Sequence, residues 1–109
     1  MTHPWPTPGT ALADVLTPMP VIDEDRLTAN IARAQAYMDA HGLAFRPHIK
    51  THKLASVAAA QVAAGAVGIN CQKLTEAEAF ADAGFDDILI TYNILGAQKL
   101  AGLRALQDR

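Results

Sequence analysis

Residues 67–91 read VGINCQKLTEAEAFADAGFDDILIT, which predicts a strand, a helix and a second strand in succession. The two strands are placed at 67–71 and 87–91. The second is apolar at consecutive positions, as expected for a strand that is covered on both faces of its sheet. A strand followed by a helix and another strand favours parallel pairing through a right-handed crossover. This unit therefore indicates an α/β fold.

The helix inside this unit has recognisable ends. Thr75 and Glu78, three residues later, form a capping-box pattern in which the threonine side chain caps the first turn. Gly84 predicts the end of the helix, because glycine readily adopts the backbone conformation of a helix C-cap. The sequence thus predicts one helix between the two strands, starting at Thr75.

The same alternation extends to both sides of this unit. Upstream, apolar residues recur at helical spacing until Gly42, a short strand is predicted over 43–46, and a second helix runs from Leu54 to a stop at Gly65. Downstream, 97–106 predicts a last helix. The apolar positions of the first helix are Leu27, Ile31, Ala34 and Met38. The residues of the last helix that are predicted to face inward are Leu100, Leu103 and Leu106.

The predicted elements define a partial domain. Residues 1–19 hold prolines at positions 4, 6, 8 and 18 and are predicted to form an irregular N-terminal arm. From residue 20 onward, helices alternate with three short strands, which would leave an open sheet edge. A (β/α)8 barrel needs about 250 residues. We therefore expect residues 20–109 to be the N-terminal part of a larger barrel enzyme.

Composition narrows the classes of function. The chain has 109 residues, half of them hydrophobic, and a formal net charge of −2, so it predicts a globular protein without nucleic-acid or membrane partners. No apolar run approaches the roughly 18 residues that span a bilayer, and the first residues do not resemble a signal peptide. Cys71 is the single cysteine, which excludes an internal disulfide. A cytoplasmic location is expected.

The candidate for chemistry is the segment 46–53, RPHIKTHK, which places five basic side chains within eight positions. If residues 43–50 are extended, Arg46, His48 and Lys50 point to the same side. A lysine beside two other basic groups has its ammonium form disfavoured, and a neutral amine can attack an aldehyde. The pattern therefore favours a Schiff-base lysine at Lys50.

Polar residues follow each of the three predicted strands. They are found at 46–53, at 70–73 and at 91–93. In parallel α/β folds, ligands bind at the carboxyl ends of the strands, so these segments are expected to converge on one site.

Several segments from Thr17 onward match the pattern of one enzyme family. They are Thr17-Pro18, 21–23, 27–31, 46–53, 68–73 together with Glu76, and 88–93. With these segments the chain resembles the N-terminal part of the D-threonine aldolase and D-serine dehydratase-like family of fold-type III pyridoxal-phosphate enzymes. The barrel of that family is similar to the N-terminal domain of alanine racemase. The string at 46–53 is the most specific part of the match.

The resemblance implies a site. Lys50 would carry pyridoxal phosphate as a Schiff base and be the catalytic residue, and His48, Gln72, Tyr92 and Asn93 would line the cofactor. Family members hold the phosphate cradle and the metal-binding residues later in the chain, so no metal ligand is expected in this segment. A divalent metal and a homodimer in the full-length parent are left open.

The resemblance also implies a reaction. The parent would be a pyridoxal-phosphate-dependent lyase acting on small D-amino acids, by retro-aldol cleavage or by dehydration and deamination. Two alternatives on the same barrel remain open at this point. One is a non-catalytic protein that binds or carries pyridoxal phosphate. The other is an amino-acid racemase, which would need a second acid or base, commonly a tyrosine from a later domain.

The residues alone also allow simpler interpretations. Lys50 is compatible with a solvated lysine at a strand end. His48 and His52 have the spacing of a metal pair, but they lack a nearby carboxylate, and Pro47 favours an extended start. A polyanion site would interleave aromatic residues with the basic ones, and the segment has none.

Overall fold

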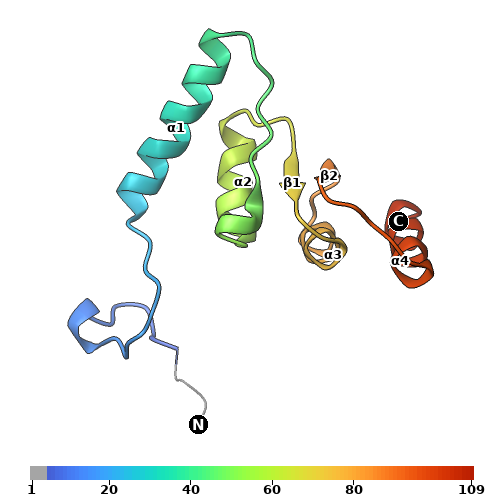
Figure 1. The fold of residues 1–109 in the computed structure, drawn as a ribbon. Coiled ribbons are helices and arrows are strands. Elements are labelled where there is room, and N and C mark those ends of the chain that lie inside the picture. Colours follow the sequence, from blue (N-terminus) through green and yellow to red (C-terminus); the bar gives the residue numbers. More distant parts are fainter. Residues whose placement is uncertain (1–4) are drawn as a thin grey trace.

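The computed structural model describes residues 5–109, so residues 1–4 of the predicted arm lie outside the described residues (Figure 1). Within this range the chain forms two 3-10 helices, four α-helices and two strands. In chain order they are η1 (Leu12–Asp14), α1 (Glu24–Ala40), η2 (Ile49–Thr51), α2 (Ala55–Ala64), β1 (Ile69–Cys71), α3 (Leu74–Asp82), β2 (Ile88–Ile90) and α4 (Ala97–Gln107). Between residues 5 and 23, η1 is the only regular element.

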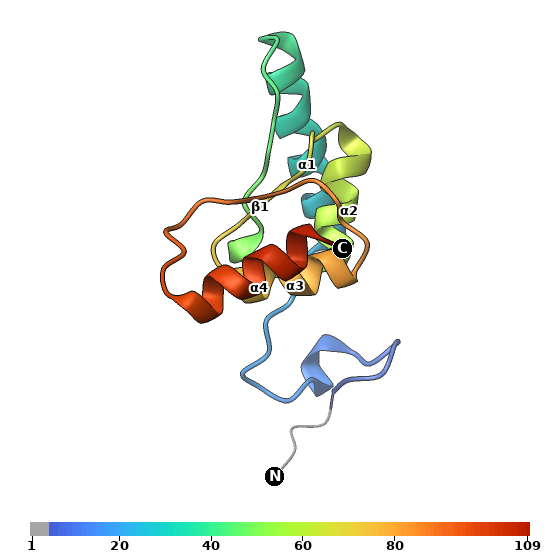
Figure 2. The ribbon, with the colours of Figure 1, turned by 90° about the vertical axis from the view of Figure 1, so that its right-hand side faces the viewer.

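β1 and β2 pair in parallel, with Ile69 opposite Ile88 and Cys71 opposite Ile90. α3 connects the end of β1 to the start of β2, as the strand-helix-strand pattern of the sequence predicts. The predicted α/β class with parallel strands is confirmed. Figure 2 shows α3 and α4 lying together on one side of the strands, and the two helices are in contact.

The predicted strand over 43–46 is wrong. The Val67 N–H donates to the Phe45 carbonyl and the Asn70 N–H donates to the Pro47 carbonyl, both at 2.9 Å, so the segment runs beside β1. Pro47 has no N–H and cannot donate in return, which interrupts the ladder. Only an isolated bridge between His48 and Asn70 remains. The segment is therefore an extended neighbour of β1 and not a regular strand.

The core lies between the sheet and the helices. Ile69 and Cys71 point toward the helices and are fully buried, together with Ile49 from η2. Side chains alternate along a strand, so Leu89 points to the opposite face and is 48% exposed. One face of the two-stranded sheet is therefore packed and the other is open. The remaining members of the core cluster are Ala58, Ala77 and Phe80, with Phe85, Ile88, Ile90 and Leu106 packed against it.

α1 confirms the first predicted helix. Its N-cap Asp23 accepts the N–H of Arg26 at 3.0 Å, which satisfies a free donor of the first turn. The helix packs against α2, and its apolar stripe is half-buried. Gly42 follows the end of the helix with a φ of +64°, a conformation that favours glycine. The half-buried residues are Leu27, Ile31, Ala34 and Met38.

Two details of the later helices differ from the sequence prediction. The N-cap of α3 is Lys73 and not Thr75, so the predicted capping box is wrong; the reason lies in Glu76, described below. In α4, Leu103 and Leu106 are half-buried, but Leu100 is 52% exposed. Residues three apart are offset by about 60° around a helix, so Leu100 lies roughly 120° from Leu106 and turns away from the core.

Candidate active site

Lys50 lies in the middle of η2, so the predicted extended run ends at His48 and does not reach it. The neighbouring Ile49 is fully buried and anchors the turn, whereas Lys50 is exposed. Nδ1 of His48 accepts the backbone N–H of Lys50 at 3.2 Å. The N–H of Lys53 donates to the Ile49 carbonyl at 2.8 Å and closes the turn. Lys50 is thus presented to solvent by a turn whose two ends are fixed.

The open face of the sheet carries polar groups beside this turn. Asn70 alternates with the buried Ile69 and Cys71, so its side chain lies on the open face, and the bridge places His48 next to it. Oγ1 of Thr91 donates to Oδ1 of Asn70 at 2.8 Å. The structure therefore joins His48, Asn70 and Thr91 at the carboxyl ends of the strands.

Glu76 connects the turn to the loop after β1. Its carboxylate is only 7% exposed; Oε2 accepts the N–H of Gln72 at 2.8 Å and Oε1 pairs with Nζ of Lys53 at 3.2 Å. Burial raises the pKa of Glu76, but the Gln72 N–H and Lys53 lower it by more, so the net direction is downward. The carboxylate is therefore ionised. Because Glu76 reaches back over the first turn, α3 can begin at Leu74 without a Thr75 cap.

Arg46 does not join Lys50 as the alternation predicted. Its guanidinium forms an ion pair with Asp87, with Nη1 2.8 Å from Oδ1, and donates to the backbone carbonyls of Ile69 and Asp87. Asp87 immediately precedes β2, so Arg46 is bound at the amino end of that strand. The expected group of three adjacent basic side chains is therefore wrong, because a carboxylate distant in sequence binds one of them.

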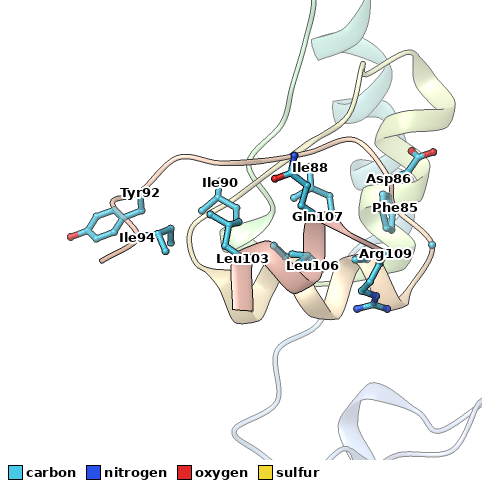
Figure 3. Close-up of a pocket in the computed structure, with 13 residues that line it drawn as sticks. Phe85, Asp86, Ile88, Ile90, Tyr92, Ile94, Leu103, Leu106, Gln107 and Arg109 are labelled. Atoms are coloured by element: carbon cyan, nitrogen blue, oxygen red, sulfur yellow. The ribbon is translucent and has the colours of Figure 1, made fainter. Parts of the chain in front are cut away.

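Tyr92 and Asn93 are placed differently from the other predicted residues. Tyr92 is 66% exposed and lies at one end of an open hollow of about 880 Å³ between β2 and α4, where Ile90 faces Leu103 (Figure 3). Asn93 is exposed in the loop after β2. No hydrogen bond among residues 5–109 links either side chain to Lys50.

Asn70 and Thr91 lie in the polar segments 70–73 and 91–93 that were expected to converge, but the sequence analysis did not single them out as site residues. Thr91 precedes Tyr92, so the alternation along β2 gives the two side chains opposite directions. The opposite directions of these two side chains could be assigned once the strand register was known. Gln72 was predicted, and the structure ties its backbone to the Lys50 turn through Glu76.

His52 is a partly buried neutral base next to the turn. Its Nδ1 accepts the N–H of Leu54 at 3.0 Å. Burial lowers the pKa of His52 below the ordinary value of 6.5, and the contacts with Gln61 and Leu54 offset only part of this effect. The folded state thus favours the uncharged ring.

We expect acid to destabilise the fold through His52. The folded-state pKa is the lower one, so the stabilisation is fully present above pH 6.5 and is lost as pH falls below it. Thermal unfolding of the full protein between pH 7.5 and pH 5 would show this loss. A His52→Asn variant keeps an acceptor for the Leu54 N–H without the titration, so its unfolding midpoint should fall less across the same range. Equal falls would contradict the assignment.

The described residues hold no cluster that could bind a metal ion. No group of three or more His, Cys, Asp or Glu side chains converges within residues 5–109. His48 and His52 each use Nδ1 to accept a backbone N–H. Among the same residues, no helix combines the length and the hydrophobicity that a membrane crossing requires.

Comparison with known families explains this arrangement of strands, helices and turn. The family model for the alanine racemase N-terminal domain matches residues 22–107. The chain belongs to this family. The resemblance expected from the sequence is confirmed, and the alternating strands and helices correspond to the N-terminal part of the alanine racemase-type barrel.

Individual relatives within the family are lyases. The chain is 46% identical over 99 residues to D-threonine aldolase of Arthrobacter sp., covering 91% of this chain and 26% of that protein. It is 59% identical over 73 residues to D-threo-3-hydroxyaspartate dehydratase of Delftia sp. strain HT23, covering 67% of this chain and 19% of that one. The chain therefore spans about a quarter or less of the length of these relatives.

Solved structures agree with the sequence relatives. D-threonine aldolase from Filomicrobium marinum superposes with a TM-score of 0.84 at 40% identity, covering 87% of this chain and 26% of that chain. A variant of D-threo-3-hydroxyaspartate dehydratase in a metal-free form superposes with a TM-score of 0.82 at 48% identity, covering 88% and 25%. The relatives are thus aldolases and dehydratases of D-amino acids.

Proposed function

We propose that the full protein is a pyridoxal-phosphate-dependent lyase that acts on small D-amino acids carrying a 3-hydroxyl group. Lys50 is the residue that binds the cofactor covalently. The observation that carries this proposal is the presentation of Lys50: it is an exposed primary amine on a fixed turn, at the carboxyl ends of parallel strands.

The residues around Lys50 fit an aldehyde cofactor. Among residues 5–109 no ion pair involves Lys50, whereas Lys53 in the same segment is engaged by Glu76. An amine that is not engaged in an ion pair is available to attack a carbonyl carbon. The polar open face beside it offers hydrogen-bonding groups to a heteroaromatic ring.

Within the described residues we assign five partners to the cofactor, with two further contacts in the loop after β2. Lys50 provides the covalent bond, and His48 and Gln72 lie on the two segments that Glu76 and the β-bridge connect. Asn70 and Thr91 add polar groups on the same open face. Tyr92 and Asn93 remain proposed contacts in the loop after β2. The phosphate and any divalent metal would be bound by residues outside 5–109.

When it is bound, the cofactor withdraws electrons from the substrate Cα, which weakens the bonds to that carbon. The chain itself positions and transfers protons. Once the substrate amine displaces it, the Lys50 amine is the natural base beside Cα. Retro-aldol cleavage would give glycine and an aldehyde, and dehydration would give a keto acid and ammonia.

The relatives favour a lyase over the other two functions considered. The aldolases and dehydratases are 39% to 59% identical to this chain over most of its length. These names support cleavage or dehydration of a 3-hydroxy D-amino acid, and neither a racemase nor a non-catalytic carrier is among them. We further propose that residues 20–109 are the first part of the barrel and that residues 5–19, the described part of the predicted arm, lie outside it. We also propose that the protein is cytoplasmic, with Cys71 a reduced, buried thiol.

Covalent labelling tests the cofactor assignment. The full protein is mixed with pyridoxal phosphate, reduced with borohydride and digested, and the modified lysine is identified by peptide mass. We expect the label on Lys50 ahead of Lys53, Lys73 and Lys99. Lys53 lies in the same turn but is paired with Glu76, and the other two lysines lie outside the turn. Label distributed evenly over the four lysines would argue against the proposed function.

A further inference from the structure

Glu76 has a more specific environment than helix capping requires. A carboxylate in the first turn of a helix is stabilised by the free N–H groups and the helix dipole, and its contact with the Gln72 N–H fits that role. The second contact, with Nζ of Lys53, does not serve α3. It instead joins α3 to a turn that precedes it by more than twenty residues.

Lys53 occupies a backbone conformation that needs compensation. Its φ of +53° is the only positive φ of a non-glycine residue among residues 5–109. Such a conformation is unfavourable for an L-residue, because it brings Cβ close to the following carbonyl oxygen. The conformation directs the chain from η2 into α2 while the Lys53 N–H closes the turn around Lys50. The ion pair with a buried carboxylate holds this strained position in place.

A continuous path therefore runs from the Lys50 turn to Gln72. It consists of the Lys53 backbone, its ammonium group, the two oxygens of Glu76 and the Gln72 N–H. η2 has only three residues, and a helix of that length has little stability of its own. Without the path, the turn keeps the burial of Ile49, its own backbone hydrogen bonds and the bridge from His48 to Asn70, but nothing ties it to α3.

We propose that Glu76 is a positioning residue: through Lys53 and the Gln72 N–H it fixes Lys50 relative to the loop after β1. This inference rests on the proposed function of Lys50. Glu76 touches neither cofactor nor substrate in this role, and acts by keeping the Lys50 amine and Gln72 at a constant separation. Restricting the amine in this way favours reaction with an aldehyde bound between the two segments.

Two single variants and their combination test the path in the full protein. Glu76→Gln keeps an acceptor for the Gln72 N–H and removes the charge facing Lys53. Lys53→Met removes the ammonium group from a side chain that is largely exposed, so it leaves the core intact. The measurements are the dissociation constant of pyridoxal phosphate, the Lys50 share of the borohydride-trapped label, and the unfolding midpoint of the cofactor-free protein.

We expect each single variant to weaken cofactor binding about tenfold, by analogy with metal sites, where losing a contact that supports a ligand weakens affinity roughly ten- to a hundredfold. The double variant should bind the cofactor no more weakly than the single variant of lower affinity, because both substitutions break the same contact. Lys53→Arg should restore binding. Lys99→Met, which removes an exposed lysine from α4, should leave it unchanged.

The outcomes separate the inference from the function on which it rests. If the wild-type protein shows no selective label on Lys50, the proposed function is contradicted, and so is the role of Glu76. If Glu76→Gln and Lys53→Met keep both the selective label on Lys50 and the wild-type affinity for pyridoxal phosphate, only the positioning role is contradicted. In that case a fall in the unfolding midpoint would assign Glu76 to stability only.

Discussion

Replacing Lys50 with alanine in the full protein is expected to abolish turnover of D-threonine and of 3-hydroxy-D-aspartate, by more than about 10³-fold, because the covalent attachment and the base are lost together. The side chain is exposed and makes no ion pair within the described residues, so its removal leaves the core of Ile49 and Ile69 unchanged. Steady-state release of aldehyde, and in parallel of ammonia, measures the effect.

The control for this prediction is Lys99→Ala, which removes a lysine of similar exposure from α4. It should retain full turnover. Lys50→Ala protein should also keep the wild-type unfolding midpoint when cofactor is absent. Unchanged turnover in Lys50→Ala would contradict the proposed function, whichever product is formed. The ratio of aldehyde to ammonia released by the wild type distinguishes an aldolase from a dehydratase.

Gly68→Ala is expected to cause the largest loss of stability. A Cβ at position 68 would lie 2.4 Å from Nη1 of Arg46 and 2.5 Å from the backbone carbonyl of Asp87. The arginine could move only by giving up its ion pair, and the carbonyl accepts the N–H of Ile69 in the sheet. Overpacking of this kind costs roughly 1–3 kcal/mol, and breaking the partly buried pair adds to it.

Gly102→Ala is the matched control. The new Cβ would lie 2.8 Å from Cδ2 of Leu74, which is the end of a flexible side chain. Alanine in a helix is also favoured over glycine by about 1 kcal/mol, so the two effects nearly cancel. We expect a small change in unfolding midpoint for Gly102→Ala and a large fall for Gly68→Ala. Adding Arg46→Ala should not rescue Gly68→Ala, since the Asp87 carbonyl remains. Equal midpoints for the two glycine variants would overturn this account.

The sequence predicted those features that depend on local patterns. Helical spacing and glycine stops located the four α-helices, and apolar runs located β1 and β2 within two residues. The same logic placed the polar segments at the carboxyl ends of the strands. These predictions succeed because side-chain periodicity and backbone freedom are properties of neighbouring residues.

Two errors arose where a distant residue competes with a local rule. The Arg46 side chain points toward Asp87, forty-one positions later in the sequence, and forms an ion pair with it. It therefore does not take the direction that the alternation of its own segment predicts. The Glu76 carboxylate takes the place of the predicted Thr75 cap. It forms an ion pair with Lys53 and accepts the Gln72 N–H. These contacts appear only when the chain is folded. The error at Pro47 is local: the residue favours an extended segment, as predicted, but its missing N–H also prevents a regular strand.

One hydrogen bond of the turn decides what His48 can offer to a bound molecule. A backbone N–H can only donate, so the contact from Lys50 fixes Nδ1 of His48 as the acceptor. The neutral imidazole must then carry its hydrogen on Nε2. In that tautomer the ring presents a donor to an oxygen or to a ring nitrogen lone pair beside Lys50. It cannot serve there as a base unless the turn that holds Lys50 first opens.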